Sequence, residues 1–84
     1  MQMTRARTPD ERFILSLFDT VKGRESRDEP VDRYEVGKQA SITPKAADAI
    51  CRLLIQANFI KKREGSLIMM TRNGEELAER LLNE

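Results

Sequence analysis

The sequence contains no histidine and only one cysteine, Cys51, among its 84 residues. Without histidine, the side chain that most often acts as a general base near neutral pH is missing. A single cysteine cannot form a disulfide within the chain, and a Cys/His zinc site cannot be assembled. The sequence also has no phosphate-binding glycine motif and no catalytic constellation. We therefore expect a protein that is not an enzyme and that needs no metal or cofactor.

Long hydrophobic runs and a charge excess of one sign are also missing. No segment approaches the ~20 apolar residues of a membrane helix, and residues 1–7 lack the apolar stretch of a signal peptide. We therefore expect a cytoplasmic protein without a membrane partner. The 15 basic and 14 acidic residues give a net charge of +1. Because a strongly basic nucleic-acid binder has a larger excess, any DNA contact must come from local clustering of charge.

The first helix is predicted over residues 9–22. Thr8 is a capping residue, Pro9 suits the first helical position, and Glu11 completes a capping box with Thr8. Gly23 follows as a helix stop. Apolar residues recur at helical spacing between these signals, at Phe13, Ile14, Leu17, Phe18 and Val21.

Two more helices are predicted on either side of a tight turn. Asp32 resembles the cap of a short helix over about 33–40, and Thr43-Pro44 repeats the cap-plus-proline start for a helix over 44–57. The turn at Ser41-Ile42 is too short for antiparallel packing, so we expect the two helices to cross steeply, as in a helix-turn-helix. The inward stripe of the second is Ala47, Ile50, Cys51 and Leu54.

The period then changes to that of strands. Residues 59–63 and 66–70 flank Glu64-Gly65, which predicts a two-stranded hairpin with Gly65 at positive φ. Thr71 caps a last helix over about 72–83, with Leu77, Ala78, Leu81 and Leu82 as its apolar side. The predicted fold is mainly α with a small β-hairpin: an α+β domain over residues 8–84, preceded by a flexible arm over 1–7.

Residues 36–82 resemble the winged helix-turn-helix of MarR-like and related small transcription regulators. The family has a Leu in helix 2, a small turn residue followed by an aliphatic residue and a Ser, a recognition helix that ends in Leu, Gly-Leu-Val-basic before the wing, and Leu-Thr-x-x-Gly after it. The matching residues are Val36, Ser41-Ile42-Thr43, Leu54, Asn58-Phe59-Ile60-Lys61 and Met70-Thr71-Arg72-Asn73-Gly74. Asn58 stands where the family prefers Gly, and Asn tolerates the left-handed conformation.

The resemblance implies a DNA-binding transcription regulator, with helix 3 (44–57) in the major groove and the wing (59–70) on the phosphate backbone. The residues that it implies to contact double-stranded DNA are Thr43, Lys45, Arg52, Lys61, Lys62, Arg63 and Arg72. The helix face has a second interpretation, as a solvated surface on which Asp48 pairs with Lys45 and Arg52. The wing lysines are equally typical of an edge strand protected from aggregation.

Three other features have two interpretations each. Arg5 and Arg7 belong either to a DNA-binding arm or to a mobile terminus. Cys51 is either a redox sensor or, as its apolar neighbours favour, a buried inert thiol. Surplus apolar residues predict either an interface or cover from helix 1 and the termini: Leu15, Leu53, Ile55, and Leu67 and Met69, which should face outward. Such an interface fits a homodimeric regulator, or a winged-helix adaptor that binds a protein partner and no DNA.

Overall fold

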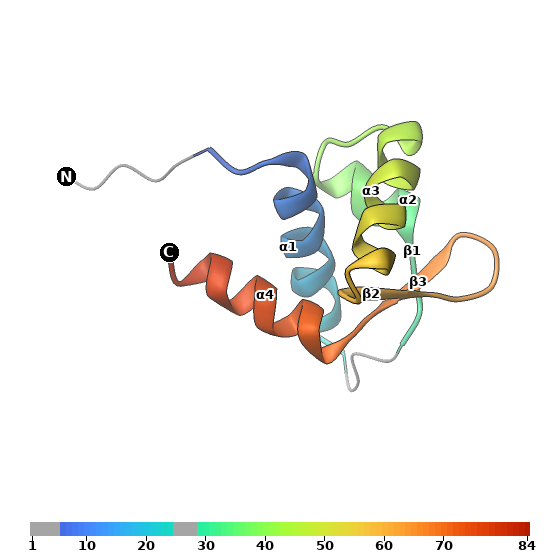
Figure 1. Ribbon diagram of the computed structural model, residues 1–84. Coiled ribbons are helices and arrows are strands. Elements are labelled where there is room, and N and C mark those ends of the chain that lie inside the picture. The colour runs from blue at the N-terminus through green and yellow to red at the C-terminus, as the bar shows by residue number, and fades with distance from the viewer. Residues whose placement is uncertain (1–5, 25–28) are drawn as a thin grey trace.

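The computed structural model describes residues 6–24 and 29–84. Along the chain, the elements are α1 (Pro9–Val21), β1 (Val31–Asp32), α2 (Arg33–Gln39), α3 (Pro44–Gln56), β2 (Ile60–Lys62), β3 (Leu67–Met70) and α4 (Arg72–Leu82). The described residues thus form a small α+β domain of four helices and one antiparallel sheet, with strand order β1-β3-β2 (Figure 1). The predicted combination of helices and a hairpin is confirmed, with element ends within two residues of those expected.

Each helix begins at the capping residue that the sequence indicates. The Thr8 side chain accepts a hydrogen bond from the Glu11 N–H while Glu11 accepts one from the Thr8 N–H, which completes the expected capping box. Thr43 and Thr71 cap α3 and α4 in the same way, through the N–H groups of Ala46 and Gly74. These bonds satisfy donors that the first turn of a helix leaves unpaired.

Strand β1 was not predicted. Its two residues, Val31 and Asp32, pair with Ile68 and Leu67 of β3, so the hairpin is extended to a three-stranded sheet. Asp32 also caps α2, because its carboxylate accepts the Tyr34 N–H at 2.9 Å. A strand this short has no hydrophobic period of its own, and only its distant partner makes it a strand.

The core lies between α1 and the other elements, because α1 contacts α2, α3, α4 and β3. The predicted inward stripes of α1 and α3 are confirmed. Phe18 of α1 is half-buried against them, and Leu82 at the end of α4, which was expected to be buried, is 56% exposed. The largest fully buried side chains are Phe13, Ile14, Leu17, Ile60, Ile68, Met70, Val36 and Cys51.

The turn between α2 and α3 is held by a close backbone approach. Ser41 takes a left-handed conformation, with φ 60°, and the Ile42 N–H donates to the Gly37 carbonyl at 2.7 Å. A Cβ on Gly37 would lie 3.2 Å from the Ile42 carbonyl oxygen and 3.3 Å from the Ala47 Cβ. The small residue therefore lets α2 and α3 pack closely at this turn.

Most of the surplus apolar residues are partly covered. Leu67 and Met69 were predicted to face outward, but both are half-buried and not exposed. Ile68 and Met70 are buried, as expected. Leu15 and Ile55 are half-buried and pack against the core. Leu53 of α3 remains 57% exposed.

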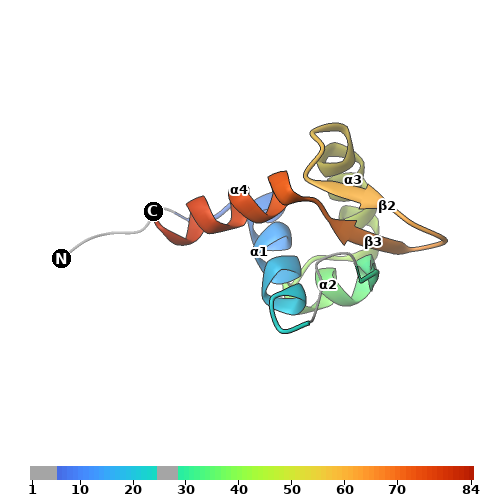
Figure 2. The same ribbon diagram turned by 90° about the horizontal axis from the view of Figure 1, so that it is seen from below.

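The β2–β3 hairpin projects at one end of the molecule, and α4 with the C-terminus lies at the other (Figures 1 and 2). At the α4 end, Arg7 is not free: its Nη2 donates to the Leu81 carbonyl at 2.9 Å and its Nη1 lies 3.6 Å from the Glu84 carboxylate. Arg5 lies outside the described residues. None of the described helices has the length and apolar character needed to cross a membrane.

Candidate nucleic-acid interface

The outward face of α3 displays the cations that the sequence indicates. Lys45 and Arg52 are exposed, and neither forms an ion pair with any residue in 6–24 or 29–84. Thr43 is exposed at the N-cap, where its oxygen accepts the Ala46 N–H at 3.2 Å. Its hydroxyl hydrogen therefore remains to donate to an incoming group.

Asp48, the one carboxylate on α3, pairs differently from the sequence prediction. Its Oδ1 lies 3.6 Å from Nη1 of Arg33 and accepts a hydrogen bond of 2.9 Å from the Tyr34 hydroxyl. The expected pairs with Lys45 and Arg52 are not formed. The hydrogen bond to Asp48 raises the pKa of Tyr34 above its usual 10.0, because the protonated hydroxyl is the donor. The start of α2 therefore neutralises Asp48, and the α3 cations keep their charge uncompensated.

Arg33 is held on two sides. Its Nε donates to the Ser66 carbonyl at 3.2 Å, and its backbone N–H donates to the same carbonyl at 3.1 Å. Its side chain is only 11% exposed, although it carries a full charge. The guanidinium is therefore fixed between α3 and the hairpin by groups on both.

The run Lys61, Lys62 and Arg63 does not form a single face. Lys61 and Lys62 are consecutive in β2, paired with Met69 and Ile68, so their side chains leave opposite faces of the strand. Arg63 follows the strand and its N–H donates to the Leu67 carbonyl at 2.8 Å. All three side chains are exposed. The hairpin therefore presents positive charge on both of its faces.

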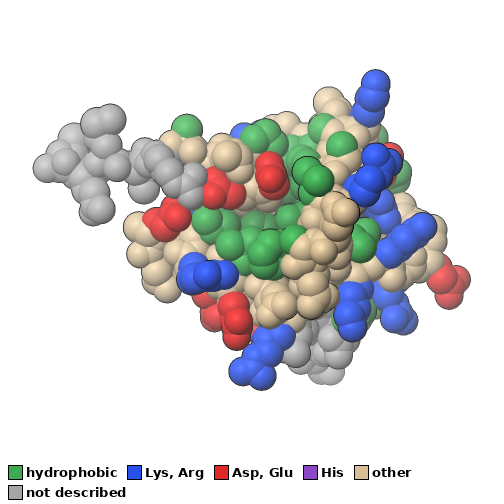
Figure 3. Space-filling model, viewed as in Figure 1, with side chains coloured by type: hydrophobic (Ala, Val, Ile, Leu, Met, Phe, Trp, Pro, Cys, Tyr) green, Lys and Arg blue, Asp and Glu red, His purple; other side chains and the backbone are tan. Residues whose placement is uncertain are grey.

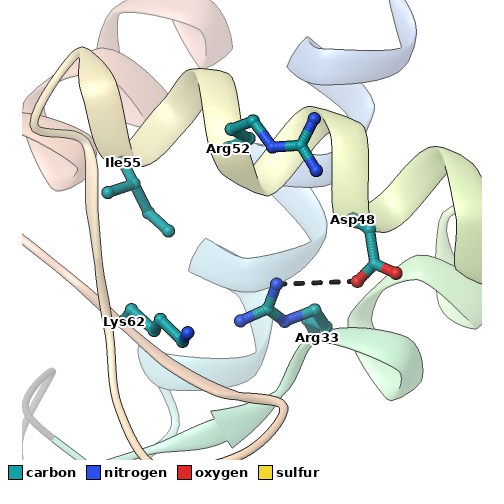
Figure 4. A pocket seen from close by; sticks show the side chains of 5 residues that line it. All are labelled: Arg33, Asp48, Arg52, Ile55 and Lys62. Carbon is teal, nitrogen blue, oxygen red and sulfur yellow. Dashed lines mark ion pairs between the residues drawn. The ribbon is translucent and has the colours of Figure 1, made fainter.

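Lys62 and Arg52 line one hollow between α3 and β2. Its volume is about 290 Å³, and its lining is completed by Arg33, Asp48 and Ile55. Figure 4 shows Arg33 between Asp48 and Lys62, with one terminal nitrogen toward Asp48 and the other toward the Lys62 side. The hollow is thus lined by three cations and one carboxylate.

The remaining predicted residue, Arg72, lies at the base of the hairpin. It is the first residue of α4, and its Nε is 3.6 Å from the Glu76 carboxylate. At the other end of the hairpin Gly65 has φ +59°, the left-handed conformation predicted for the turn. Asn58 likewise has φ 65°, as its place in the pattern requires. Arg72 is therefore already paired, and it does not line the hollow that Arg52 and Lys62 share.

Positive charge gathers on the α3–hairpin surface, which we define as residues 43–70. This segment has five cations and two carboxylates, a net charge of +3, while the whole chain has +1. In Figure 3, Lys and Arg side chains cluster over α3 and the hairpin, and Asp and Glu side chains lie mainly toward α1 and α4. One acid of the segment, Asp48, is paired, and the other, Glu64, is exposed in the hairpin turn.

Cys51 lies under this surface and away from solvent. It is a fully buried free thiol on the inner stripe of α3. Burial raises its pKa from 9.0 to about 11, which keeps it protonated and unreactive. Among the described residues no cluster of acidic or cysteine side chains is arranged to hold a metal ion.

Sequence reasoning did not find Arg33 and Tyr34 as parts of this site. Asp32 to Glu35 gave a capping signal only, and no spacing within α2 indicates that two of its side chains reach Asp48, which is 14 or 15 positions along the chain. Their role depends on how α2 packs against α3. Comparison with protein-family models, curated protein sequences and solved structures finds no match to this chain. Its function has therefore to be inferred from its own residues and contacts.

Proposed function

We propose that this chain is a winged helix-turn-helix protein that binds double-stranded DNA and acts as a transcription regulator. In this proposal α3 enters the major groove and the β2–β3 hairpin is the wing that lies along the phosphate backbone. Support comes from the order α1-β1-α2-α3-β2-β3-α4, in which a tight turn joins α2 to α3 and a hairpin follows directly. A helix at the major groove and a basic projection at the backbone are the usual division of DNA contacts.

The observation that carries the proposal is the pairing of Asp48 with Arg33. A carboxylate on the outer face of α3 would repel DNA phosphates if it stood alone or lowered the charge of its neighbours. Because Arg33 and the Tyr34 hydroxyl occupy it, Lys45 and Arg52 remain available for phosphates or guanine edges. The net charge of +3 on the α3–hairpin surface then gives the local clustering that the near-neutral chain needs.

The direct test is a fluorescence titration of the chain into a labelled duplex of arbitrary sequence. Replacing Lys61, Lys62 and Arg63 together with Ala should weaken binding to every sequence and flatten its salt dependence, because each lost phosphate contact lowers the slope by ~0.9. The matched control replaces three cations outside the α3–hairpin surface, Lys22, Arg24 and Arg80, and changes the net charge equally. Equal losses in the two triple variants would remove the wing from the proposal.

A second candidate function is a winged-helix interaction module that binds a second copy of itself instead of DNA. Leu53 on α3 and Leu82 on α4 are 57% and 56% exposed, and Figure 3 shows hydrophobic side chains gathered over α1 between α3 and α4. A homodimer through this face also suits a regulator that reads a palindromic site. Sedimentation equilibrium of the full chain decides the point: a monomer at all concentrations removes the module, whereas a dimer that ignores duplex DNA favours it.

A further inference from the structure

We propose that the hollow between α3 and β2 is a binding site for a single phosphate group. Arg52, Lys62 and the terminal nitrogen of Arg33 that does not face Asp48 would bind this phosphate. This inference rests on the proposed DNA-binding function, and the phosphate is a phosphodiester of the duplex backbone. It assigns Arg33, which lies outside the helix and the hairpin of the proposed contact surface, as a direct ligand of DNA.

The first argument is the state of Arg33. Two of its side-chain nitrogens are engaged, Nε by the Ser66 carbonyl and Nη1 by Asp48, and Figure 4 shows the remaining terminal nitrogen directed to the Lys62 side of the hollow. A guanidinium anchored in this way is already ordered before a ligand arrives. A fixed donor of this kind loses little conformational entropy on binding an anion, and planar guanidinium groups suit phosphate oxygens.

The second argument is the charge of the hollow. Arg33, Arg52 and Lys62 face it with three positive charges, and Asp48 offsets one of them. Ile55 adds an apolar side chain to the lining. A volume of about 290 Å³ is large enough for a phosphate group together with water molecules.

The third argument is position. The hollow lies between α3 and β2. In the proposed complex, a DNA strand that runs from the major groove at α3 to the backbone contacts of the hairpin passes over this hollow. Lys62 alone of the basic run points to this side, while Lys61 leaves the opposite face of β2. Asp48 is then a positioning residue: it holds Arg33 in place rather than reading a base.

The first arm of the test uses inorganic phosphate and the full chain. Phosphate is titrated at constant ionic strength against chloride while the side-chain Nε–H signals of the arginines are followed by NMR. The Arg33 signal should shift and saturate with phosphate alone, and Lys62→Ala should weaken this binding at least threefold, whereas Arg80→Ala leaves it unchanged. A response that chloride reproduces, or that Lys62→Ala does not alter, would refute the proposed phosphate-binding site.

Asp48→Asn gives the sharper test, because asparagine keeps an oxygen that can accept from Tyr34 and Arg33. Removing the negative charge beside the anion should tighten phosphate binding by about threefold or more. The matched control is Asp19→Asn, which changes the net charge equally but removes the partner of Lys22 on α1. If phosphate binding tightens equally in both variants, or does not tighten in Asp48→Asn, the result would contradict a phosphate-binding site beside Asp48.

The second arm uses duplex DNA and separates this inference from the proposed function. Because Arg52 and Lys62 act on one shared phosphate, Arg52→Ala and Lys62→Ala should each reduce the slope of log affinity against log salt by up to ~0.9, and Arg80→Ala should not reduce it. If the duplex binds and all three variants behave alike, the proposed phosphate-binding site is wrong and the proposed function stands. If inorganic phosphate saturates the hollow and the duplex does not bind, the proposed function is wrong and the phosphate is not one of DNA.

Discussion

Replacing Gly74 with alanine should destabilise the domain, although alanine is normally the better helix former. A Cβ at this position would lie 2.1 Å from the Phe59 carbonyl oxygen and 3.0 Å from the Phe59 carbonyl carbon. Both atoms are backbone, so no side chain can rotate away. The start of α4 must therefore move away from the residue that precedes β2.

The size of the effect follows from three contributions. Alanine gains ~1 kcal/mol over glycine in helix propensity. Overpacking in a filled site costs ~1–3 kcal/mol. The movement also strains two hydrogen bonds of Thr71, from its N–H to the Phe59 carbonyl at 3.1 Å and from its hydroxyl to the Asn58 carbonyl at 2.6 Å, each of which contributes ~1 kcal/mol. If both hydrogen bonds are lost, these contributions sum to a net loss of about 2–4 kcal/mol in the free energy of unfolding.

Urea denaturation followed by far-UV circular dichroism measures this loss, and the melting temperature should fall by about 8–30 °C. The matched control is Gly23→Ala, because a Cβ there meets no heavy atom within 4 Å and the φ of Gly23 is not positive. This variant should stay within ~1 kcal/mol of the parent chain, on the stabilising side. A Gly74→Ala variant as stable as the parent would refute the close approach of α4 to Phe59.

Further predictions concern the buried thiol, Arg7 and the turn of the β2–β3 hairpin. Because burial raises the pKa of Cys51 from 9.0 to about 11, folding favours the protonated thiol, and this stability is full below pH 9 and lost as pH rises through 11. Between pH 8 and pH 10.5 the parent chain should lose about 2 kcal/mol more than Cys51→Ala in urea titrations, and parallel curves would contradict this. Arg7→Ala removes a charged hydrogen bond to the last turn of α4 and should cost about 1–2 kcal/mol, so an unchanged melting temperature would show that this contact contributes nothing. Gly65→Ala places a Cβ at φ +59° and should cost ~1 kcal/mol in the same assay without weakening DNA binding by more than its effect on folding; a stabilised variant would contradict the strained turn.

The sequence predicts those parts of the fold that depend on neighbours in the chain. The helix starts are predictable from their capping residues, because each cap accepts a hydrogen bond from an N–H group three residues away: Thr8, Thr43 and Thr71. Two turns are predictable from Asn58 and Gly65, because few residues tolerate a positive φ. Gly74 belongs to the pattern that suggested the fold, and the structure supplies its reason, the approach to Phe59.

What the sequence does not predict depends on distant partners. Val31 and Asp32 form a strand only because β3 is beside them, and Arg7 contacts the end of α4, whose Leu81 carbonyl accepts its hydrogen bond. In the candidate site, the cations of α3 and the hairpin are readable from helical spacing and from the basic run. The pairing of Asp48 is not, because local spacing favours Lys45 and Arg52 whereas the packing of α2 brings Arg33 and Tyr34.

The affinity of the full chain for duplex DNA as a function of salt concentration tests the central claim most directly. Lys45, Arg52, Lys61, Lys62 and Arg63 are exposed on the α3–hairpin surface. If Arg52 and Lys62 share one phosphate and the other three cations take one each, log affinity should fall against log salt with a slope of about −3 to −4. A slope near zero, or no binding at low salt, would contradict a DNA-binding role for this surface.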